Sequence, residues 1–340
     1  MSSLVRSRSP RWLLWLAAAV LAAATAAALW LNRPLPLRPH SGAVVDVWIQ
    51  PGQTVGQIAD TIVQAGVDTP ALWLHAWFRL SGQGRRIQAG SYELTAGVTP
   101  RSLLEMLVSG RQATRRITLV EGWNVRQVLQ AVRAAEFLHD DLPAGDDPVA
   151  LARHLGLSAE HAEGQFFPDT YVYPKRSPAS GVLRQAARVM AERLAQAWAQ
   201  RQPDLPLRSP QEALILASLI EKETGLEADR ARIAAVFVNR LRLGMRLQTD
   251  PAVIYGLGDT FDGNLRRRDL LTDTPYNTYT RAGLPPTPIA MPGWASLLAA
   301  VQPARTRELY FVARGDGSSA FSHTLEEHNR AVRRYQLGRP

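Results

Sequence analysis

The hydrophobic pattern begins with an uncharged, largely apolar stretch from Trp12 to Leu31. As a helix rising about 1.5 Å per residue, this stretch is long enough to cross the roughly 30 Å hydrocarbon core of a bilayer. Arginines precede it, and tryptophans stand at both ends, where indole rings favour the membrane interface. The pattern therefore predicts a cytoplasmic tail at residues 1–11, a transmembrane helix at residues 12–31 and an exported body.

A cleaved signal peptide is the alternative, because the alanine runs at residues 22–24 and 26–28 resemble cleavage sites. The apolar stretch is longer than the roughly 7–15 residues of a signal core, so we favour an uncleaved anchor. Pro34, Pro36 and Pro39 follow it and predict a stiff linker at residues 32–43 that lifts the body off the bilayer.

A local pattern then recurs: an apolar strand, a glycine, a cap residue two positions later, and a helix with one apolar stripe. Its three copies carry Gly52 with Thr54, Gly97 with Thr99, and Gly122 with Asn124. These units, above all residues 47–66, resemble the LysM glycan-binding module, so residues 44–139 are predicted as a LysM-like region. An economical turn without carbohydrate binding is the equal alternative.

Another helix is predicted from Ser209-Pro210-Gln211-Glu212, a capping box with proline at the first helical position. Residues 213–220 are apolar nearly all round, which indicates a buried helix, and Gly225 ends it. Strand–helix units followed by long helices predict an α+β fold, with a mainly helical second domain at residues 140–340.

This buried helix ends in two glutamates that cannot share a face, because residues two apart are about 200° apart around a helix. Glu223 continues the apolar row of Leu216, Leu219 and Ile220, whereas Glu221 follows Ala217 and Ser218. Burial and the negative helix end both raise a carboxyl pKa, as a general acid requires. The alternative is a solvated helix end, with either glutamate paired to Lys222, Arg230 or Arg232.

The region after this helix is polar, rich in proline and glycine, and poor in charge. Amides, hydroxyls and tyrosine rings suit sugar hydroxyls and pyranose faces. Half-buried packing is the alternative for each tyrosine. The candidate substrate-binding residues are Gln248, Asp250, Tyr255, Tyr276, Asn277 and Tyr279.

The amino-acid composition narrows the classes of protein and of partner that remain possible. With 46% hydrophobic residues the chain is not disordered, and a formal charge of +9 favours an anionic partner. The absence of cysteine excludes disulfides, thiolate zinc sites and cysteine nucleophiles. Because the sequence also lacks His-Glu-x-x-His, a phosphate-binding glycine loop and Gly-x-Ser-x-Gly, we predict no metal and no cofactor. An exported body argues against nucleic acid as the anion.

Several short motifs then occur in a fixed order: EKET at 221–224, VFVNRL at 236–241, LQTDP at 247–251, YNTY at 276–279, GLPP at 283–286, LYFV at 309–312 and EHN at 327–329. Their order and spacing resemble the endolytic murein transglycosylase, or YceG-like, family. Weaker similarity reaches back to the anchor. One departure is Ser319, which stands where the family usually has histidine, while His323 lies two residues beyond Phe321.

The resemblance implies a single-pass protein of the bacterial inner membrane, with a periplasmic LysM-like region and catalytic domain. It implies internal cleavage of nascent peptidoglycan strands, which limits their length, with Glu223 as the acid/base. Glu223 would protonate the bond between N-acetylmuramic acid and N-acetylglucosamine, then take the muramic 6-hydroxyl proton as a 1,6-anhydro ring closes. Gln248 and Asn277 are candidates for contacts near the developing positive charge. Peptidoglycan, the inner membrane and peptidoglycan synthases are the expected partners.

Two other functions remain open. Asp250 could serve as a second carboxylate in a lysozyme-like hydrolase, because hydrolytic glycosidases use two carboxyl groups. Alternatively, the chain is a non-catalytic scaffold that binds peptidoglycan through its LysM-like region.

Overall fold

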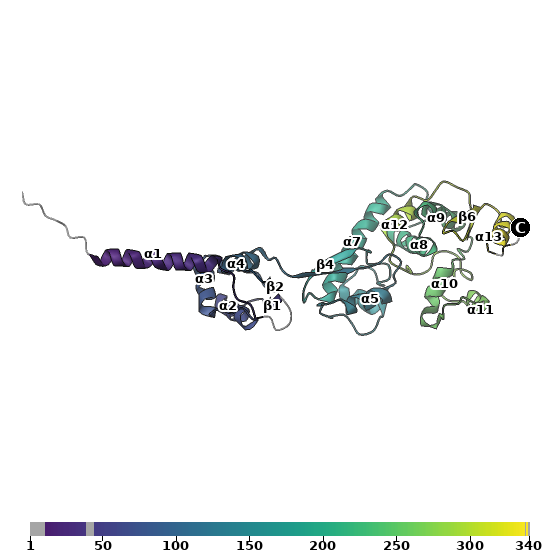
Figure 1. Ribbon diagram of the computed structural model, residues 1–340. Helices are drawn as coiled ribbons and strands as arrows, with labels where there is room; N and C mark the ends of the chain where they lie inside the picture. Colours follow the sequence, from purple (N-terminus) through teal and green to yellow (C-terminus); the bar gives the residue numbers. More distant parts are fainter. Residues whose placement is uncertain (1–10, 39–43, 337, 339–340) are drawn as a thin grey trace, which may run out of the picture. The chain divides into compact units, whose positions relative to one another are not determined.

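The computed structural model describes residues 11–38, 44–336 and 338 (Figure 1). Residues 1–10 of the predicted tail and 39–43 of the predicted linker lie outside these ranges. The chain forms two compact units: the first runs to Arg115 and takes in Pro174–Arg176, and the second comprises Arg116–Tyr173 and the residues from Ser177 on. Helices and strands occur in both units, which confirms the mixed α and β character predicted from the sequence.

The N-terminal helix α1 spans Arg11–Asn32. Its segment from Trp12 to Asn32 has a mean hydropathy of 2.0 and is not buried within the structure. A helix that is apolar and exposed all round is stable only where something other than water surrounds it. This helix therefore suggests a single-pass membrane anchor.

The segment that follows α1 differs from the predicted spacer. Leu35 is buried in the core of the first unit, and its amide donates to the Val98 carbonyl at 2.8 Å. The Arg38 amide donates to the Gly66 carbonyl at 2.7 Å, and the Asp68 amide donates to the Pro36 carbonyl at 2.8 Å. The prolines keep residues 33–38 extended, but the backbone groups of Leu35, Pro36 and Arg38 form hydrogen bonds with the rest of the unit. This segment is therefore fixed to the first unit.

The first unit is built around an antiparallel pair, β1 (Val44–Ile49) and β2 (Gly90–Thr95), in which Val47 lies opposite Tyr92. Between these strands come α2 (Val55–Gln64), α3 (Ala71–Leu80) and a 3-10 turn at Gly84–Arg86, and α4 (Pro100–Ser109) follows β2. Their apolar faces form one core, which includes Ile62, Phe78, Tyr92 and Leu103.

The predicted turn chemistry is confirmed in all three copies. Gly52, Gly97 and Gly122 have φ of 84°, 95° and 77°, a region that glycine adopts without strain. Thr54, Thr99 and Asn124 each accept from the third amide of the following helix in a complete capping box. The third copy, however, belongs to the second unit, because the compact division falls after Arg115, before the expected domain boundary at residues 139 and 140.

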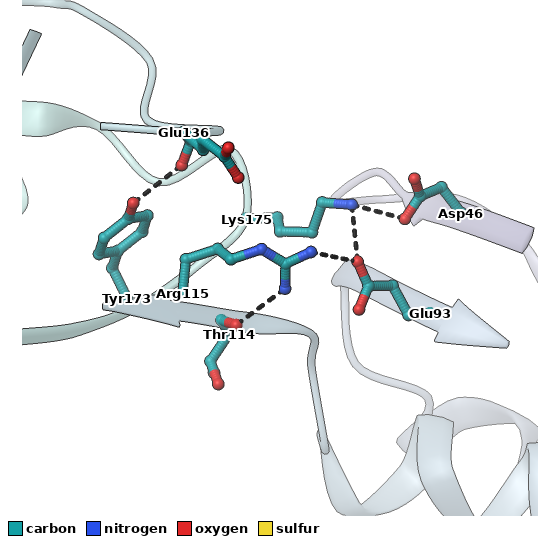
Figure 2. Close-up of polar contacts among 7 residues, drawn as sticks. All are labelled: Asp46, Glu93, Thr114, Arg115, Glu136, Tyr173 and Lys175. Atoms are coloured by element: carbon teal, nitrogen blue, oxygen red, sulfur yellow. Dashed lines mark hydrogen bonds and ion pairs between the residues drawn. The ribbon is translucent and has the colours of Figure 1, made fainter. Parts of the chain in front are cut away.

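Strands β3 (Thr114–Thr118) and β4 (Thr170–Pro174) are hydrogen-bonded to each other and carry the chain from one unit to the other and back. In the first unit, the buried Lys175 ammonium donates to Asp46 at 2.6 Å and to Glu93 at 2.9 Å (Figure 2). Arg115 also donates to Glu93, at 2.7 Å, and lowers the pKa of that carboxyl. These ion pairs attach both passing segments to β1 and β2.

The second unit is mainly helical, with a small strand component. One of the two hydrophobic clusters formed by its described residues surrounds α8 (Pro210–Glu223), on which every residue from Ala213 to Ile220 is buried, as predicted. Helices α7 (Ala179–Ala199), α9 (Glu227–Arg242) and α12 (Trp294–Val301) pack around α8. The other elements are α5 (Val125–Ala134), α6 (Pro148–Leu155), α10 (Asp250–Leu257), a 3-10 turn at Gly258–Thr260, α11 (Arg267–Leu271), the antiparallel pair β5 (Tyr310–Ala313) and β6 (Ser319–Ser322), and α13 (Leu325–Tyr335).

Candidate active site

Glu223 is the last residue of α8, so the predicted helix end is confirmed. At the other end, Ser209 Oγ accepts from the Glu212 amide at 3.2 Å. The Glu212 carboxylate accepts from the Arg208 amide at 2.6 Å, one residue earlier than a reciprocal capping box would place it. A buried, well-capped helix thus presents a carboxyl from its final turn.

A cavity of about 540 Å³ lies in front of this carboxyl. Three of the predicted substrate-binding residues, Gln248, Asp250 and Tyr279, line it together with Glu223. The remaining wall comes from α9, β5, β6 and α13, and includes Arg240, Tyr310, Ser319 and His328. The structure thus brings half of the predicted binding set to the predicted acid/base.

The surroundings of the Glu223 carboxyl favour its protonated form. Burial raises its pKa to about 7, and the neighbouring Asp250 carboxylate adds to the rise. The hydroxyl of Thr249 donates to Glu223 Oε1 at 2.5 Å and, with Arg240, opposes that rise. A carboxyl with a pKa near neutral can both give and take a proton at physiological pH.

Thr249 directly precedes α10, and Thr278 of a later loop holds its backbone in place. The Thr249 amide donates to Thr278 Oγ1 at 2.9 Å, and that hydroxyl donates to the Thr249 carbonyl at 3.2 Å. Gln248 has a φ of 52°, a strained value for a residue with a side chain. Arg240 Nη1 donates to the Gln248 side-chain oxygen at 3.2 Å and to the Leu247 carbonyl at 2.9 Å. Contacts from α9 and the later loop therefore maintain this strained turn.

Asp250 stands at the start of α10, where its charge is favourable for the helix, and it is exposed to the cavity. Tyr279 donates its hydroxyl to Asp250 Oδ1 at 2.5 Å. Asp250 begins α10, Tyr279 lies in a loop 29 positions later in the chain, and the two residues form one polar wall of the cavity.

Tyr255 and Tyr276 lie elsewhere, although the sequence grouped them with Glu223. They line a second cavity of about 600 Å³, and their rings meet edge to face at 4.9 Å. Tyr255 donates to Glu163 Oε2 at 3.0 Å, and the Val125 amide donates to Glu163 Oε1 at 3.0 Å. Burial raises the pKa of Glu163 to about 7. Sequence reasoning missed Glu163 because it occupies a loop without helical or strand periodicity.

Asn277 does not face either cavity. It is buried, and its side-chain amide donates to the carbonyls of Asp269, Leu270 and Thr272, while its oxygen accepts from the Tyr279 amide. All of its polar atoms are occupied by the loop backbone. The side chain of Asn277 therefore organises the backbone of this loop.

Glu221 is more buried than its helical row with Ala217 and Ser218 indicated, because only 7% of its side chain is exposed. It accepts from the Gly293 amide at 3.0 Å and lies 3.7 Å from the Arg230 guanidinium. The alternative of an ion pair with a nearby arginine therefore holds for Glu221, which lies beside Arg230. The two carboxyls differ in their partners, because Glu223 accepts from Thr249.

Four further residues of the site were not singled out from the sequence: Arg240, Thr249, Tyr310 and His328. Tyr310 and His328 stack at 5.2 Å, at an angle of 24°, along one wall of the cavity. The only sequence signal for these four residues is that each lies inside one of the short motifs that resemble the YceG-like family. Ser319 also lines the cavity, whereas His323 is exposed and lies outside its lining.

Together, these features place one carboxyl of near-neutral pKa in an open polar cavity of a protein of mixed helix and strand. The sequence matches the profile of the YceG-like family over residues 47–334, and the chain belongs to this family. The resemblance drawn from the motifs is thereby confirmed.

Individual relatives agree with this assignment. A Bacillus subtilis (strain 168) protein named endolytic murein transglycosylase is 31% identical over 316 residues, which cover 88% of this chain and 87% of that protein. A Streptococcus pneumoniae (strain D39) protein of the same name is 26% identical over 335 residues, covering 89% of this chain and 60% of that protein. The 2.6 Å crystal structure of a YceG-like protein from Listeria monocytogenes superposes with a TM-score of 0.54 at 27% identity, covering 85% of this chain and 99% of that one.

Proposed function

We propose that this protein is an endolytic murein transglycosylase that cleaves peptidoglycan glycan strands without water. The observation that carries the proposal is Glu223: a single carboxyl of raised pKa, held by Thr249, in an open cavity. The same residue is the second glutamate of the family motif. The names of the relatives supply the substrate.

In the first step, Glu223 protonates the glycosidic oxygen between N-acetylmuramic acid and N-acetylglucosamine. Because Oε1 accepts the Thr249 hydroxyl, Oε2 is the oxygen that carries and delivers the proton. The bond from the muramic C1 to that oxygen breaks, and positive charge develops on the muramic ring. The Glu223 carboxylate then takes the 6-hydroxyl proton while O6 bonds to C1, which forms the 1,6-anhydro ring and restores the acid.

Gln248, Asp250 and Tyr279 are the proposed substrate contacts. The exposed Asp250 carboxylate is suited to stabilise the positive charge, and Tyr279 fixes its orientation through the 2.5 Å hydrogen bond. The stacked Tyr310 and His328 offer a flat wall for a sugar face. Tyr255 and Tyr276, in the second cavity, would contact substrate only beyond the reacting sugars.

Hydrolysis is the competing function, because Asp250 lies in the same cavity as Glu223. The ends of the products separate the two reactions: hydrolysis leaves reducing ends, and the lytic route leaves 1,6-anhydro ends. Asp250→Asn should keep anhydro product at a lower rate if Asp250 only stabilises charge. Reducing ends on the products of the wild-type protein would favour hydrolysis.

The wider arrangement extends the same proposal. Helix α1 would span the inner membrane with a cytoplasmic N-terminus, which places both units in the periplasm near nascent strands and their synthases. The first unit would act as a LysM-like region and the second as the catalytic domain. Support for the LysM-like assignment comes from the β1–α2–α3–β2 order around one core.

A further inference from the structure

Helix α3 of the first unit is apolar on two faces. Leu74 and Phe78 are fully buried in the core, while Leu72, Trp73 and Leu80 point outward and are 71%, 53% and 85% exposed. A helix that faces water on one side normally carries polar residues there. Three large apolar side chains on one short helix therefore indicate a surface that contacts something other than water.

This surface adjoins the end of the membrane helix. Trp73 meets Trp30 of α1 edge to face, with ring centroids 5.7 Å apart. An apolar groove of about 340 Å³ runs between the two helices. It is lined by Ala26, Ala27, Trp30, Leu31, Trp73, Ala76, Trp77 and Leu80. The outer face of α3 thus continues the lipid-facing surface of α1 within a single compact unit.

The groove fixes the depth of α3 relative to α1. Leu80 lines this groove together with Ala26 and Ala27, which precede the end of α1 by more than one helical turn. Interfacial helices bury their apolar face roughly 5–10 Å into the boundary between headgroups and acyl chains. A span that ends at Asn32 would therefore place Leu80 at that boundary and Trp73 among the headgroups.

Charge and side-chain type agree with a lipid surface. Arg33 follows α1, Arg79 lies in the last turn of α3, and Arg85 and Arg86 come shortly after it, all exposed. Such cations attract anionic headgroups and extend their charges to the interface while their stems stay apolar. Indole rings also favour this layer.

We propose that α3 lies in the membrane interface beside the end of α1, so that the first unit rests on the bilayer through Leu72, Trp73 and Leu80. This inference rests on the membrane anchorage proposed for α1 and is independent of the reaction. It also gives the fixed segment 33–38 a purpose, because that segment holds the unit against the end of the anchor.

The chain lacks cysteine, so single cysteines can carry spin labels without a background. Leu72→Cys and Leu80→Cys replace exposed side chains and leave the core intact. Val20→Cys, within α1, reports the bilayer interior, and Asp60→Cys, exposed on α2 of the same unit, reports water. The full chain is reconstituted in vesicles of phosphatidylethanolamine and phosphatidylglycerol, and collisions of each label with oxygen and with a water-soluble nickel complex are measured.

We expect labels at positions 72 and 80 to favour oxygen over nickel, as at position 20, while the label at position 60 favours nickel. Nickel accessibility at 72 and 80 equal to that at 60 would overturn the proposal. Shielding of 72 and 80 from both reagents would also overturn it, because it would mean that a second copy or another protein covers α3. A water-exposed label at position 20 would remove the anchor and the proposal together. Glycan cleavage by the same vesicles reports separately on the reaction.

Discussion

Thr249 donates its hydroxyl hydrogen to Oε1 of Glu223 across 2.5 Å. Thr249 directly precedes α10 and lies 26 positions along the chain from Glu223, which ends α8 and lines the cavity. The contact leaves Oε2 to exchange protons, and it moderates a pKa that burial alone would raise further. Orientation and acidity of the proposed acid therefore depend on the same hydroxyl.

Thr249→Val removes this hydroxyl at nearly constant volume. The pKa of Glu223 should rise, because the lost hydrogen bond lowers it in the wild type. The loss of orientation should lower kcat/KM at pH 7 by roughly 10- to 100-fold. The pH at which activity falls on the alkaline side should move upward. A pH profile of anhydro-product formation checks this, with Thr249→Ser restoring both properties; an unchanged profile in Thr249→Val would contradict it.

The raised pKa of Glu223 also predicts how stability depends on pH. The folded-state pKa of about 7 exceeds the ordinary glutamate pKa of 4.5, so the folded state binds the proton more tightly than the unfolded state. The carboxyl therefore costs stability as pH rises above about 4.5, and the cost is complete above about 7. Glu223→Gln removes this cost of up to about 3 kcal/mol.

Urea unfolding of wild type and Glu223→Gln at pH 5 and pH 8 measures this difference. The advantage of the glutamine variant should grow between the two pH values. Glu192→Gln, at an exposed position on α7, is the control and should show no such growth. Equal pH dependence of wild type and Glu223→Gln would show that the Glu223 carboxyl is not raised in the folded protein.

Glu163 has a similar pKa of about 7 but lies in the other cavity. If the reaction takes place at Glu223, Glu163→Gln should retain anhydro-product formation within about tenfold of wild type, because the amide keeps the volume and can still accept from the Val125 amide. The rate of anhydro-product formation is measured for the wild type and for Glu163→Gln. Complete loss of activity in a folded Glu163→Gln protein would place the reaction in the second cavity.

Asn277 is predicted to matter for folding. Asn277→Ala leaves the partly buried carbonyls of Asp269, Leu270 and Thr272 without their side-chain donor, which should destabilise the protein by about 2 kcal/mol. The midpoint of thermal unfolding checks this. Asn264→Ala, exposed in the same region, should leave the midpoint unchanged. A normal midpoint in Asn277→Ala, with cleavage lost, would instead support direct contact with substrate.

Local features of the fold could be predicted from the sequence because their signals lie within a few residues. The turn at Gly52 and the cap at Thr54 depend only on glycine freedom and one side-chain oxygen. The apolar run before Glu223 likewise indicates a buried helix end by itself. Such features do not depend on how the rest of the chain packs.

Long-range partners could not be predicted in this way. Tyr255, Tyr276 and Tyr279 carry the same chemistry, but their hydroxyls meet Glu163, Thr287 and Asp250, respectively. Which partner each one meets depends on how α10 and its flanking loops pack. Glu221 and Glu223 differ in partners that lie on other elements. The segment 33–38 has the composition of a spacer, yet its backbone groups are matched by those of the first unit.

The most direct test of the account is digestion of isolated peptidoglycan sacculi by the full-length protein and its Glu223→Gln variant, with mass spectrometry of the released ends. The account predicts 1,6-anhydro ends from the interior of strands with wild type, and loss of that product in a variant that still folds. Equal release by both proteins, or reducing ends from wild type, would contradict it.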